Sequence, residues 1–217
     1  YGMVGNDAIS DRRFFYLSDV NLNDPNRSAM FGTNNAYGRD GVSIRNYENR
    51  NVTWEVSRQL NLGTEMTLFK DFRVIAEYFR NLKSDVLQDR ASIPTSMGLE
   101  APISANIGKV ESQGFELSLD GRKNLNSSLW LAAMGNFTFA TNKFLEFEEP
   151  AYNEQYRYMK GQPLNRQRAF IAERLFVDDY EAQNSPTQIF SSNGIAPMGG
   201  DIKYRDLNGD GKIDFDD

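Results

Sequence analysis

Apolar and polar residues alternate over a long stretch, from Val52 to Phe69. One set of alternate positions is almost wholly apolar and the other almost wholly polar. The apolar set is Val52, Trp54, Val56, Arg58, Leu60, Leu62, Thr64, Met66 and Leu68. A period of two predicts a β-strand whose two faces meet different environments. Because a strand needs only about 9–11 residues to cross a bilayer, this one is long enough to cross and to extend well beyond it.

A second alternating stretch follows after a short turn at Lys70-Asp71. Apolar positions from Phe72 to Leu82 share one face, which predicts a strand that forms a hairpin with the first. The residue types in Val74–Leu87 also suit a helix, so a helix is the competing interpretation there. Lys-Asp is not a favoured hairpin dipeptide, and the pattern leaves the turn geometry open.

Two further alternating stretches predict a second hairpin. Asn106–Arg122 and Leu129–Asn142 each place apolar residues on one face, and a turn at Asn124–Ser128 separates them. Gly114 within the third strand indicates a bulge or a close backbone approach. Ala91–Asn106 contains Pro and Gly and is expected to be a loop. Long antiparallel strands in consecutive hairpins predict an all-β fold of the up-and-down barrel type.

The remaining segments carry weaker patterns. Tyr1–Asn6 is expected to be the end of a strand, and Asp7–Asn51 a long irregular loop without a sustained period. The alternation is lost from Leu145 onward. Arg168–Val177 could form one more strand, and the residues from there to Met198 are expected to be loop.

Composition narrows the function classes. The 217 residues include no Cys and no His, which excludes catalysis and zinc binding by those side chains. The net charge of −6 argues against a nucleic-acid-binding protein, which would present a basic surface. No apolar run approaches the ~18 residues of a membrane helix, but strands of a membrane barrel alternate and leave the mean hydropathy low.

The last residues, Asp206–Asp217, have the spacing of a calcium-binding loop. A 12-residue loop supplies oxygen ligands from positions 1, 3, 5, 7, 9 and 12. Those positions hold Asp206, Asn208, Asp210, the Lys212 carbonyl, Asp214 and Asp217. Gly211 falls where the chain turns sharply, and Ile213 falls where an apolar anchor is expected. The flanking segments do not suggest helices, so we expect calcium without an EF-hand, against the alternative of a surface turn tightened by its own side chains.

Other chemical candidates are weaker. Glu146, Glu148 and Glu149 could pair for acid–base catalysis, but a run of carboxylates beside Pro150 is more typical of a solvated face, and the same holds for Asp178-Asp179. The aromatic residues Tyr152, Tyr156 and Tyr158 could stack on sugar rings or pack against one another. No convergent catalytic set is present, so we do not expect an enzyme.

Several segments together resemble the SusC/RagA type of TonB-dependent outer-membrane transporter. They span nearly the whole chain in order, and the set is more specific than any one of them. They are the Tyr-Gly-x-x-Gly-Asn segment at Tyr1–Asn6, Trp54-Glu55 with Asn61-Leu62-Gly63, Asp85–Leu87, Asn106-Ile107-Gly108, Gly114–Leu117, and Gly200–Tyr204 running into Asp206–Asp214.

This resemblance implies a 22-stranded barrel with a plug, driven by TonB, that imports glycans or peptides under a SusD-like lipoprotein lid in the outer membrane of a Bacteroidetes-like Gram-negative cell. It implies that residues 1–217 are a partial barrel domain without the plug and terminal strands, and that residues 201–217 form the calcium-type loop within it. The apolar face would then meet lipid. Arg58 should lie near or beyond the membrane interface, because Arg at the bilayer midplane costs about 2–4 kcal/mol.

The second interpretation, of a different class, is a soluble all-β carbohydrate-binding module with a calcium-stabilised loop. In such a module the apolar faces would be covered by sheet-on-sheet packing. The two interpretations therefore differ in what covers the apolar face of the long strands.

Overall fold

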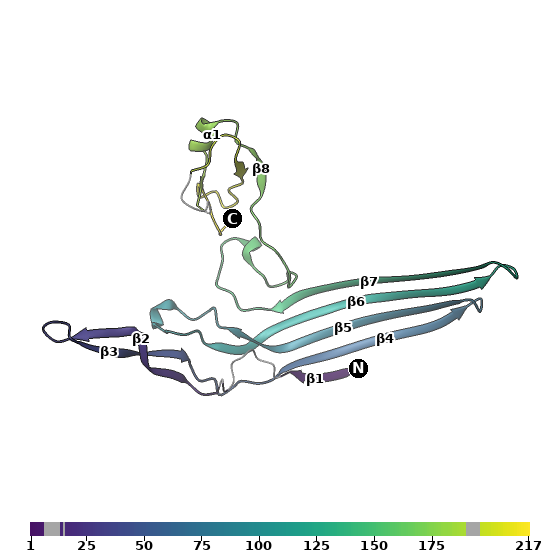
Figure 1. The fold of residues 1–217 in the computed structure, drawn as a ribbon, viewed down its shortest axis with the longest axis horizontal. Coiled ribbons are helices and arrows are strands. Elements are labelled where there is room, and N and C mark those ends of the chain that lie inside the picture. Colours follow the sequence, from purple (N-terminus) through teal and green to yellow (C-terminus); the bar gives the residue numbers. More distant parts are fainter. Residues whose placement is uncertain (7–13, 15, 190–195) are drawn as a thin grey trace. The chain divides into compact units, whose positions relative to one another are not determined.

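The computed structural model describes residues 1–6, 14, 16–189 and 196–217 of the chain. They form two compact units, which are described separately. The first comprises residues 1–151 and 159–164, and the second residues 152–158 and 165–217. Figure 1 shows the elements of both units, coloured along the sequence.

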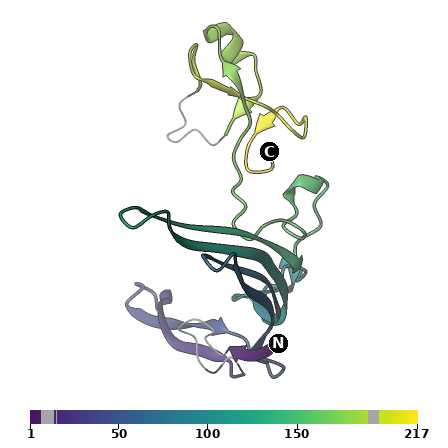
Figure 2. The ribbon, with the colours of Figure 1, turned by 90° about the vertical axis from the view of Figure 1, so that its right-hand side faces the viewer.

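The first unit is built on a five-stranded antiparallel sheet with the strand order β1-β4-β5-β6-β7. Its strands are β1 (Gly2–Asn6), β4 (Glu55–Leu68), β5 (Phe72–Asp89), β6 (Ser104–Asn124) and β7 (Trp130–Glu146). The 21 residues of β6 reach roughly 70 Å at ~3.4 Å per residue, about twice what a barrel strand needs to cross a bilayer. The four long strands run side by side in Figure 1, and Figure 2 shows the curvature of their sheet.

The two predicted hairpins are confirmed. β4 pairs with β5 and β6 with β7, each without interruption over its central residues. The helix considered for Val74–Leu87 is wrong, because these residues lie inside β5 and pair with strands on both sides. The loop expected at Ala91–Asn106 is observed up to β6 and contains only a short 3-10 turn, η1 (Thr95–Met97).

The two ends of this sheet have different connections. At one end, the hairpin turns are short: Phe69–Asp71 joins β4 to β5, and residues 125–129 join β6 to β7. Phe69 and Lys70 take left-handed backbone angles, with φ of 52° and 66°, and the Asp71 N–H donates to the Leu68 carbonyl oxygen at 3.2 Å. Positive φ at both central residues is a feature of type I′ turns, whose twist matches that of the strands they join. At the other end, the connections are long.

The long stretch before β4 differs from its prediction. Within Asp7–Asn51, the expected irregular loop, residues 7–13 and 15 lie outside the described residues. The remainder contains a hairpin of β2 (Asp19–Phe31) and β3 (Tyr37–Asn46). The hairpin is exposed on both faces over most of its length, and its register shifts at three places. A two-sided polar hairpin carries no alternation of apolar and polar residues, so the period that identifies other strands was absent here.

Glu100, in the loop after β5, ties this hairpin to the main sheet. Its carboxylate forms a 2.9 Å ion pair with Arg27 of β2 and accepts a 2.7 Å hydrogen bond from the backbone N–H of Ile44 in β3. One acidic side chain therefore contacts both strands of the hairpin.

The second unit consists of short elements. They are η2 (Gln155–Arg157), β8 (Ala172–Leu175), α1 (Asp179–Gln183), β9 (Thr187–Gln188), β10 (Ile202–Tyr204) and β11 (Lys212–Ile213). β8 pairs with β10 in an antiparallel ribbon and β9 with β11 in a parallel one. The strand considered for Arg168–Val177 is therefore confirmed over four residues only. The segment up to Met198 was expected to be loop. Its residues 190–195 lie outside the described residues, and the part that the structure describes contains α1 and β9.

Glycines beneath aromatic rings mark several contacts between neighbouring strands. A Cβ on Gly114 would lie 2.2 Å from the Phe139 carbonyl oxygen and 2.7 Å from the Phe79 ring, and a Cβ on Gly121 would lie 2.3 Å from the Phe72 ring. The close-approach interpretation of Gly114 is confirmed and the bulge is not, because the register is continuous there. Each ring fills the space that the glycine leaves open.

Asn106 fastens the long-connection end of the sheet. Its side-chain amide donates to the Thr53 and Asp85 carbonyl oxygens at 3.0 and 2.8 Å, and its side-chain oxygen accepts from the Thr53 N–H at 3.0 Å. Asp85 lies at a β-bulge of β5 and has a left-handed φ of 59°. One side chain thus satisfies the backbone groups that this bulge and the start of β4 leave unpaired.

We predict that Gly114→Ala destabilises the sheet by about 1–3 kcal/mol, because the added methyl group overlaps a backbone oxygen that cannot move without disrupting β7. Thermal unfolding of the full-length protein in detergent measures the change. Gly135→Ala in β7 is the matched control, since a Cβ there meets no described atom within 4 Å. Equal melting temperatures for the two variants would contradict the close-approach role of Gly114.

Candidate functional site

Cross-strand register sorts the side chains of β4 to β7 into rows on each face of the sheet. Four adjacent rows on one face are apolar apart from a threonine and the hydroxyl of a tyrosine. The rows are Leu62, Tyr78, Phe115 and Phe139; Thr64, Ala76, Leu117 and Phe137; Met66, Val74, Leu119 and Gly135; and Leu68, Phe72, Gly121 and Ala133. We call these sixteen positions the apolar band. On β7 it continues to Leu131, so it spans about 27 Å along that strand.

The apolar band is open to its surroundings. Leu62 is 60% exposed, Phe139 52% and Tyr78 39%. Soluble monomers rarely expose contiguous apolar surface on this scale, so this face requires an apolar environment.

The band ends at a row rich in aromatic rings, and charge begins directly beyond it. Tyr78, Phe115 and Phe139 occupy adjacent strands in the first row, which we call the aromatic row. The next row contains Arg80 of β5, and the row after it contains Arg58. Arg58 therefore lies outside the apolar band, as expected. Aromatic residues at the edge of an apolar zone are characteristic of barrel strands at a membrane interface.

The opposite face of the same strands is polar. Its rows include Glu65, Arg73 and Asp120 as well as Glu77 and Glu116, which lie directly opposite each other on β5 and β6. Arg73 and Glu65 form an exposed ion pair at 2.7 Å. The sheet thus separates an apolar face from a charged face, as the wall of a water-filled barrel does.

The predicted calcium loop is compact and internally hydrogen-bonded. Asp206 accepts from the N–H groups of Gly209 and Gly211 at 2.6 and 2.9 Å, and Asp217 accepts from those of Leu207 and Asp214 at 2.9 and 3.0 Å. Asn208, Asp210 and Asp214 each accept from the backbone N–H two residues further on.

The loop backbone matches the expectations made for its turn and its anchor. Gly209 and Gly211 have φ of 77° and 81°, angles that favour glycine. Ile213 is 1% exposed and pairs through β11 with β9, so it is the apolar anchor. Among the described residues, three or more His, Cys, Asp or Glu side chains do not gather closely enough to hold a metal ion. The ligand set therefore stays a prediction.

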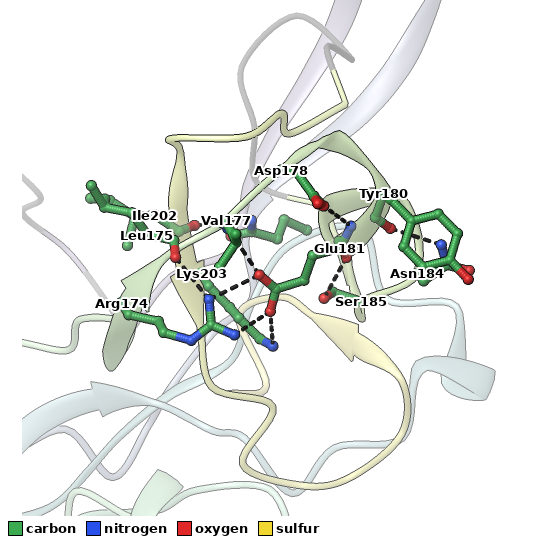
Figure 3. A network of polar contacts seen from close by, with 11 residues as sticks. Arg174, Leu175, Val177, Asp178, Tyr180, Glu181, Asn184, Ser185, Ile202 and Lys203 are labelled. Carbon is green, nitrogen blue, oxygen red and sulfur yellow. Dashed lines mark hydrogen bonds and ion pairs between the residues drawn. The ribbon is translucent and has the colours of Figure 1, made fainter.

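A network of charged side chains, partly exposed to solvent, organises the second unit around Glu181 of α1, and the sequence pattern did not single it out. Figure 3 shows Glu181 between Arg174 of β8 and Lys203 of β10. Its carboxylate accepts hydrogen bonds from both guanidinium amino groups of Arg174, from the Val177 N–H at 2.9 Å, and from the Lys203 ammonium at 3.0 Å. These donors, the Arg174 guanidinium first, lower the pKa of Glu181 to about 2.

Glu148 and Glu149, which the sequence offered as weak catalytic candidates, instead hold loops in place by hydrogen bonds. Glu148 accepts from Arg90 and from Ser92, and these hydrogen bonds, that of Ser92 first, lower its pKa. Glu149 accepts from the N–H groups of Met159 and Lys160. The two carboxylates therefore bind different loops and do not form a catalytic pair, and they are not simply a solvated face.

The remaining candidates also have structural partners. Asp178 caps the N-terminus of α1 by accepting from the Glu181 N–H at 2.8 Å. The Tyr152 and Tyr158 rings pack edge to face at 5.3 Å, while the Tyr156 hydroxyl donates to the Asp216 carbonyl oxygen. Tyr152 and Tyr158 thus pack against each other, whereas Tyr156 contacts the Asp-rich loop.

The second unit also contains a hollow of about 390 Å³ beside the Asp-rich loop. Its lining includes Arg166, Phe170, Phe215 and Asp214. The sequence gave no indication of it, because its wall combines residues from two segments about 40 positions apart.

These features define a wall segment of a membrane β-barrel with large surface loops. The chain matches the "TonB dependent receptor-like, beta-barrel" family over residues 20–212, and it belongs to this family. No helix among the described residues has the length and apolar character needed to cross a membrane.

Three curated relatives come from the bacterium Formosa agariphila. TonB-dependent receptor P3 is 25% identical over 98% of this chain, P39 is 26% identical over 99%, and P26 is 28% identical over 100%. The chain spans only about a fifth of each relative, 21%, 22% and 21% of their lengths.

Solved structures with the same fold include the RagAB peptide transporter, with a TM-score of 0.54 and 20% identity over 82% of this chain and 19% of the matched chain. The "closed-closed" and "open-open" states of the RagAB peptide importer each give a TM-score of 0.56 with 17% identity, over 94% and 90% of this chain and 21% and 20% of theirs. At these identities, the similarity establishes the fold.

We predict that Glu181→Gln opens the second unit at neutral pH, because a neutral amide cannot replace the carboxylate between two cations. Limited proteolysis of the full-length protein, followed by mass spectrometry of residues 165–217, measures the change. The folded pKa of about 2 lies below the unmodified value of 4.5, so the stabilisation is present above pH 4.5 and is lost as the pH falls through about 2.

The difference in protease resistance between Glu181→Gln and the unmodified protein should therefore shrink towards pH 2. Glu173→Gln is the control, since Glu173 pairs only with Arg205 among the ion pairs of the described residues. Equal resistance of all three proteins at pH 7 would contradict the organising role of Glu181.

Proposed function

We propose that this chain forms part of the barrel wall of a TonB-dependent importer in the outer membrane of a Gram-negative, Bacteroidetes-like bacterium. The observation that carries the proposal is the apolar band, which is bounded by the aromatic row and backed by a charged opposite face. In this arrangement the band contacts lipid and the charged face lines the water-filled interior. Transport, and no chemical transformation of the cargo, is the function.

The asymmetry of the connections supports one orientation of the wall in the membrane. Short turns are typical of the periplasmic end of such barrels, and long loops of the extracellular end. The β2–β3 hairpin, the loop after β5 and the residues following β7 are then extracellular. Exposed loops there would contact cargo, which we propose to be glycan or peptide, and a SusD-like surface lipoprotein that covers the entrance. The energy would come from TonB acting on a plug elsewhere in the polypeptide.

The soluble binding module is less well supported. It requires a second layer over the apolar band, and the band's side chains are substantially exposed in the described part of the chain. Family membership and the fold shared with the RagAB transporter also favour transport.

Cell fractionation tests the proposed location. We expect the full-length product to sediment with the outer membrane and to require detergent for extraction, because the apolar band cannot be hydrated without a large free-energy cost. Introducing Leu117→Arg into the middle of the band should reduce assembly, with a cost of about 2–4 kcal/mol at the bilayer midplane. Ser118→Arg, at the neighbouring position on the charged face, is the control. Recovery of the unmodified protein as a monodisperse soluble species would refute the proposal.

We further propose that the Asp206–Asp217 loop binds calcium. The donor set fits a hard cation, since it offers carboxylate, amide and carbonyl oxygens around two glycines with left-handed angles. Asp210 and Asp214 each use one oxygen for a loop amide and retain a second oxygen for the ion. The ion would stabilise the extracellular loop in which these residues lie.

Calorimetric titration of EDTA-treated full-length protein measures this binding. Calcium should bind at one site, and Asp210→Ala should remove the heat because it deletes the ligand at position 5. Asp216→Ala lies in the same loop but outside the ligand positions and is the control. Absence of binding heat in the unmodified protein would refute the calcium proposal and would leave the transport proposal unaffected.

A further inference from the structure

Directly beyond the aromatic row, the lipid-side face of the sheet carries a cluster of cations. Arg58 of β4, Arg80 of β5 and Lys143 of β7 project from this face, in the two rows that follow the row of Tyr78, Phe115 and Phe139. Two and four residues along a strand correspond to about 7 and 13 Å beyond the aromatic row. We call Arg58, Arg80 and Lys143 the cation cluster.

The cluster has a net positive charge within an acidic chain. The one carboxylate in these rows is Glu111 of β6, whose side chain is 6% exposed. Arg80 donates from Nε to Glu111 at 2.7 Å, and the Lys143 ammonium lies 3.3 Å from its other oxygen. Three cations and one anion leave a formal charge of +2, whereas the whole chain carries −6. Glu111 is thus a buried support that holds two cations in place without neutralising the group.

The side chains of the cation cluster keep N–H groups exposed that can donate hydrogen bonds to a ligand. The Arg80 and Lys143 side chains are 51% and 47% exposed although both pair with Glu111. Arg58 is exposed, and its Nη1 donates to the Ser84 hydroxyl at 3.2 Å. That hydroxyl donates in turn to the Asp85 carboxylate, so Ser84 links Arg58 to Asp85. Gln113, beside Arg80 in register, adds an amide at the same level.

The position of the cluster identifies the chemistry of its ligand. A cation beyond the aromatic edge of a lipid-facing band lies at the depth of the lipid headgroups. From Arg58 on β4 to Lys143 on β7 the cluster spans three strand spacings, or about 14 Å, which is wider than one phosphate. Arginine binds phosphate through paired N–H groups, and lysine binds it as a point charge.

We propose that the cation cluster binds the phosphorylated headgroup of a lipid in the extracellular leaflet, with the acyl chains of that lipid lying on the apolar band. The inference rests on the proposed membrane location and orientation. It adds a specific lipid site to the outer surface of the barrel, on the opposite side of the wall from the cargo path. The band and the cluster are continuous on the same strands, so one amphiphile contacts both.

Native mass spectrometry of the full-length protein, extracted in mild detergent and depleted of lipid, tests the site. The probe is lipid A carrying its phosphates, compared with the same lipid after phosphatase treatment. The double variant Arg58→Gln/Lys143→Gln should bind the phosphorylated probe at least fivefold more weakly. It keeps the Arg80–Glu111 pair, so it does not leave the buried carboxylate without a partner.

The matched control is Lys83→Gln/Arg122→Gln, which removes one lysine and one arginine from the opposite face of the same sheet, on β5 and β6. The control should bind the phosphorylated probe as the unmodified protein does. Equal weakening in both double variants, or equal binding of the dephosphorylated probe to the unmodified protein, would overturn the proposal.

Two further measurements complete the test. In the first, inorganic phosphate is added as a competitor. If it displaces the lipid probe with an affinity equal to that of the lipid, the cluster is a site for free anions and the assignment to lipid is overturned. In the second, membrane fractionation of the same samples distinguishes failure of the proposed function from failure of the lipid-site inference. A protein that fails to enter the membrane contradicts the proposed function, whereas an inserted protein without phosphate-dependent binding contradicts this inference alone.

Discussion

The need to pair every backbone polar group inside the protein governs this structure, because hydrocarbon offers no hydrogen-bond partner. The uninterrupted register across β4, β5, β6 and β7 meets that need over the whole apolar band. The two register shifts in the β5–β6 pairing lie beyond the charged rows, on either side of Val86, and Asn106 donates a hydrogen bond to the Asp85 carbonyl oxygen there. Regular pairing in the band and irregular pairing outside it are two results of the same constraint.

Close packing between the strands also depends on contacts between glycines and aromatic rings on neighbouring strands. Phe79 lies over Gly114 on the charged face, and Phe72 lies over Gly121 on the apolar face. These contacts fix the strands against one another without a core, since the sheet has no second layer among the described residues. Among the segments that carry the family resemblance, Gly114 therefore has a steric function, and Asn106 has a hydrogen-bonding one.

A strand could be predicted from the sequence where its two faces meet different environments, because that difference imposes an alternation of apolar and polar residues. Lipid on one face and water on the other impose a period of two, so β4 to β7 could be predicted from residues such as Leu62 and Leu117. The β2–β3 hairpin meets water on both sides, and no period marks it. Glu181 could not be found, because Arg174 and Lys203 approach it from separate strands. Local spacing did indicate Ile213 as the anchor of its loop.

The β2–β3 hairpin leaves the wall after β1 and returns to it at β4, yet β1 and β4 pair directly, with Asn6 opposite Glu55. The sheet is therefore continuous at this point, and the hairpin takes no part in the pairing of β1 with β4. Insertions, deletions or wholesale exchange of this segment would leave the wall intact. Evolution can thus remodel this segment without having to solve the membrane-folding problem again.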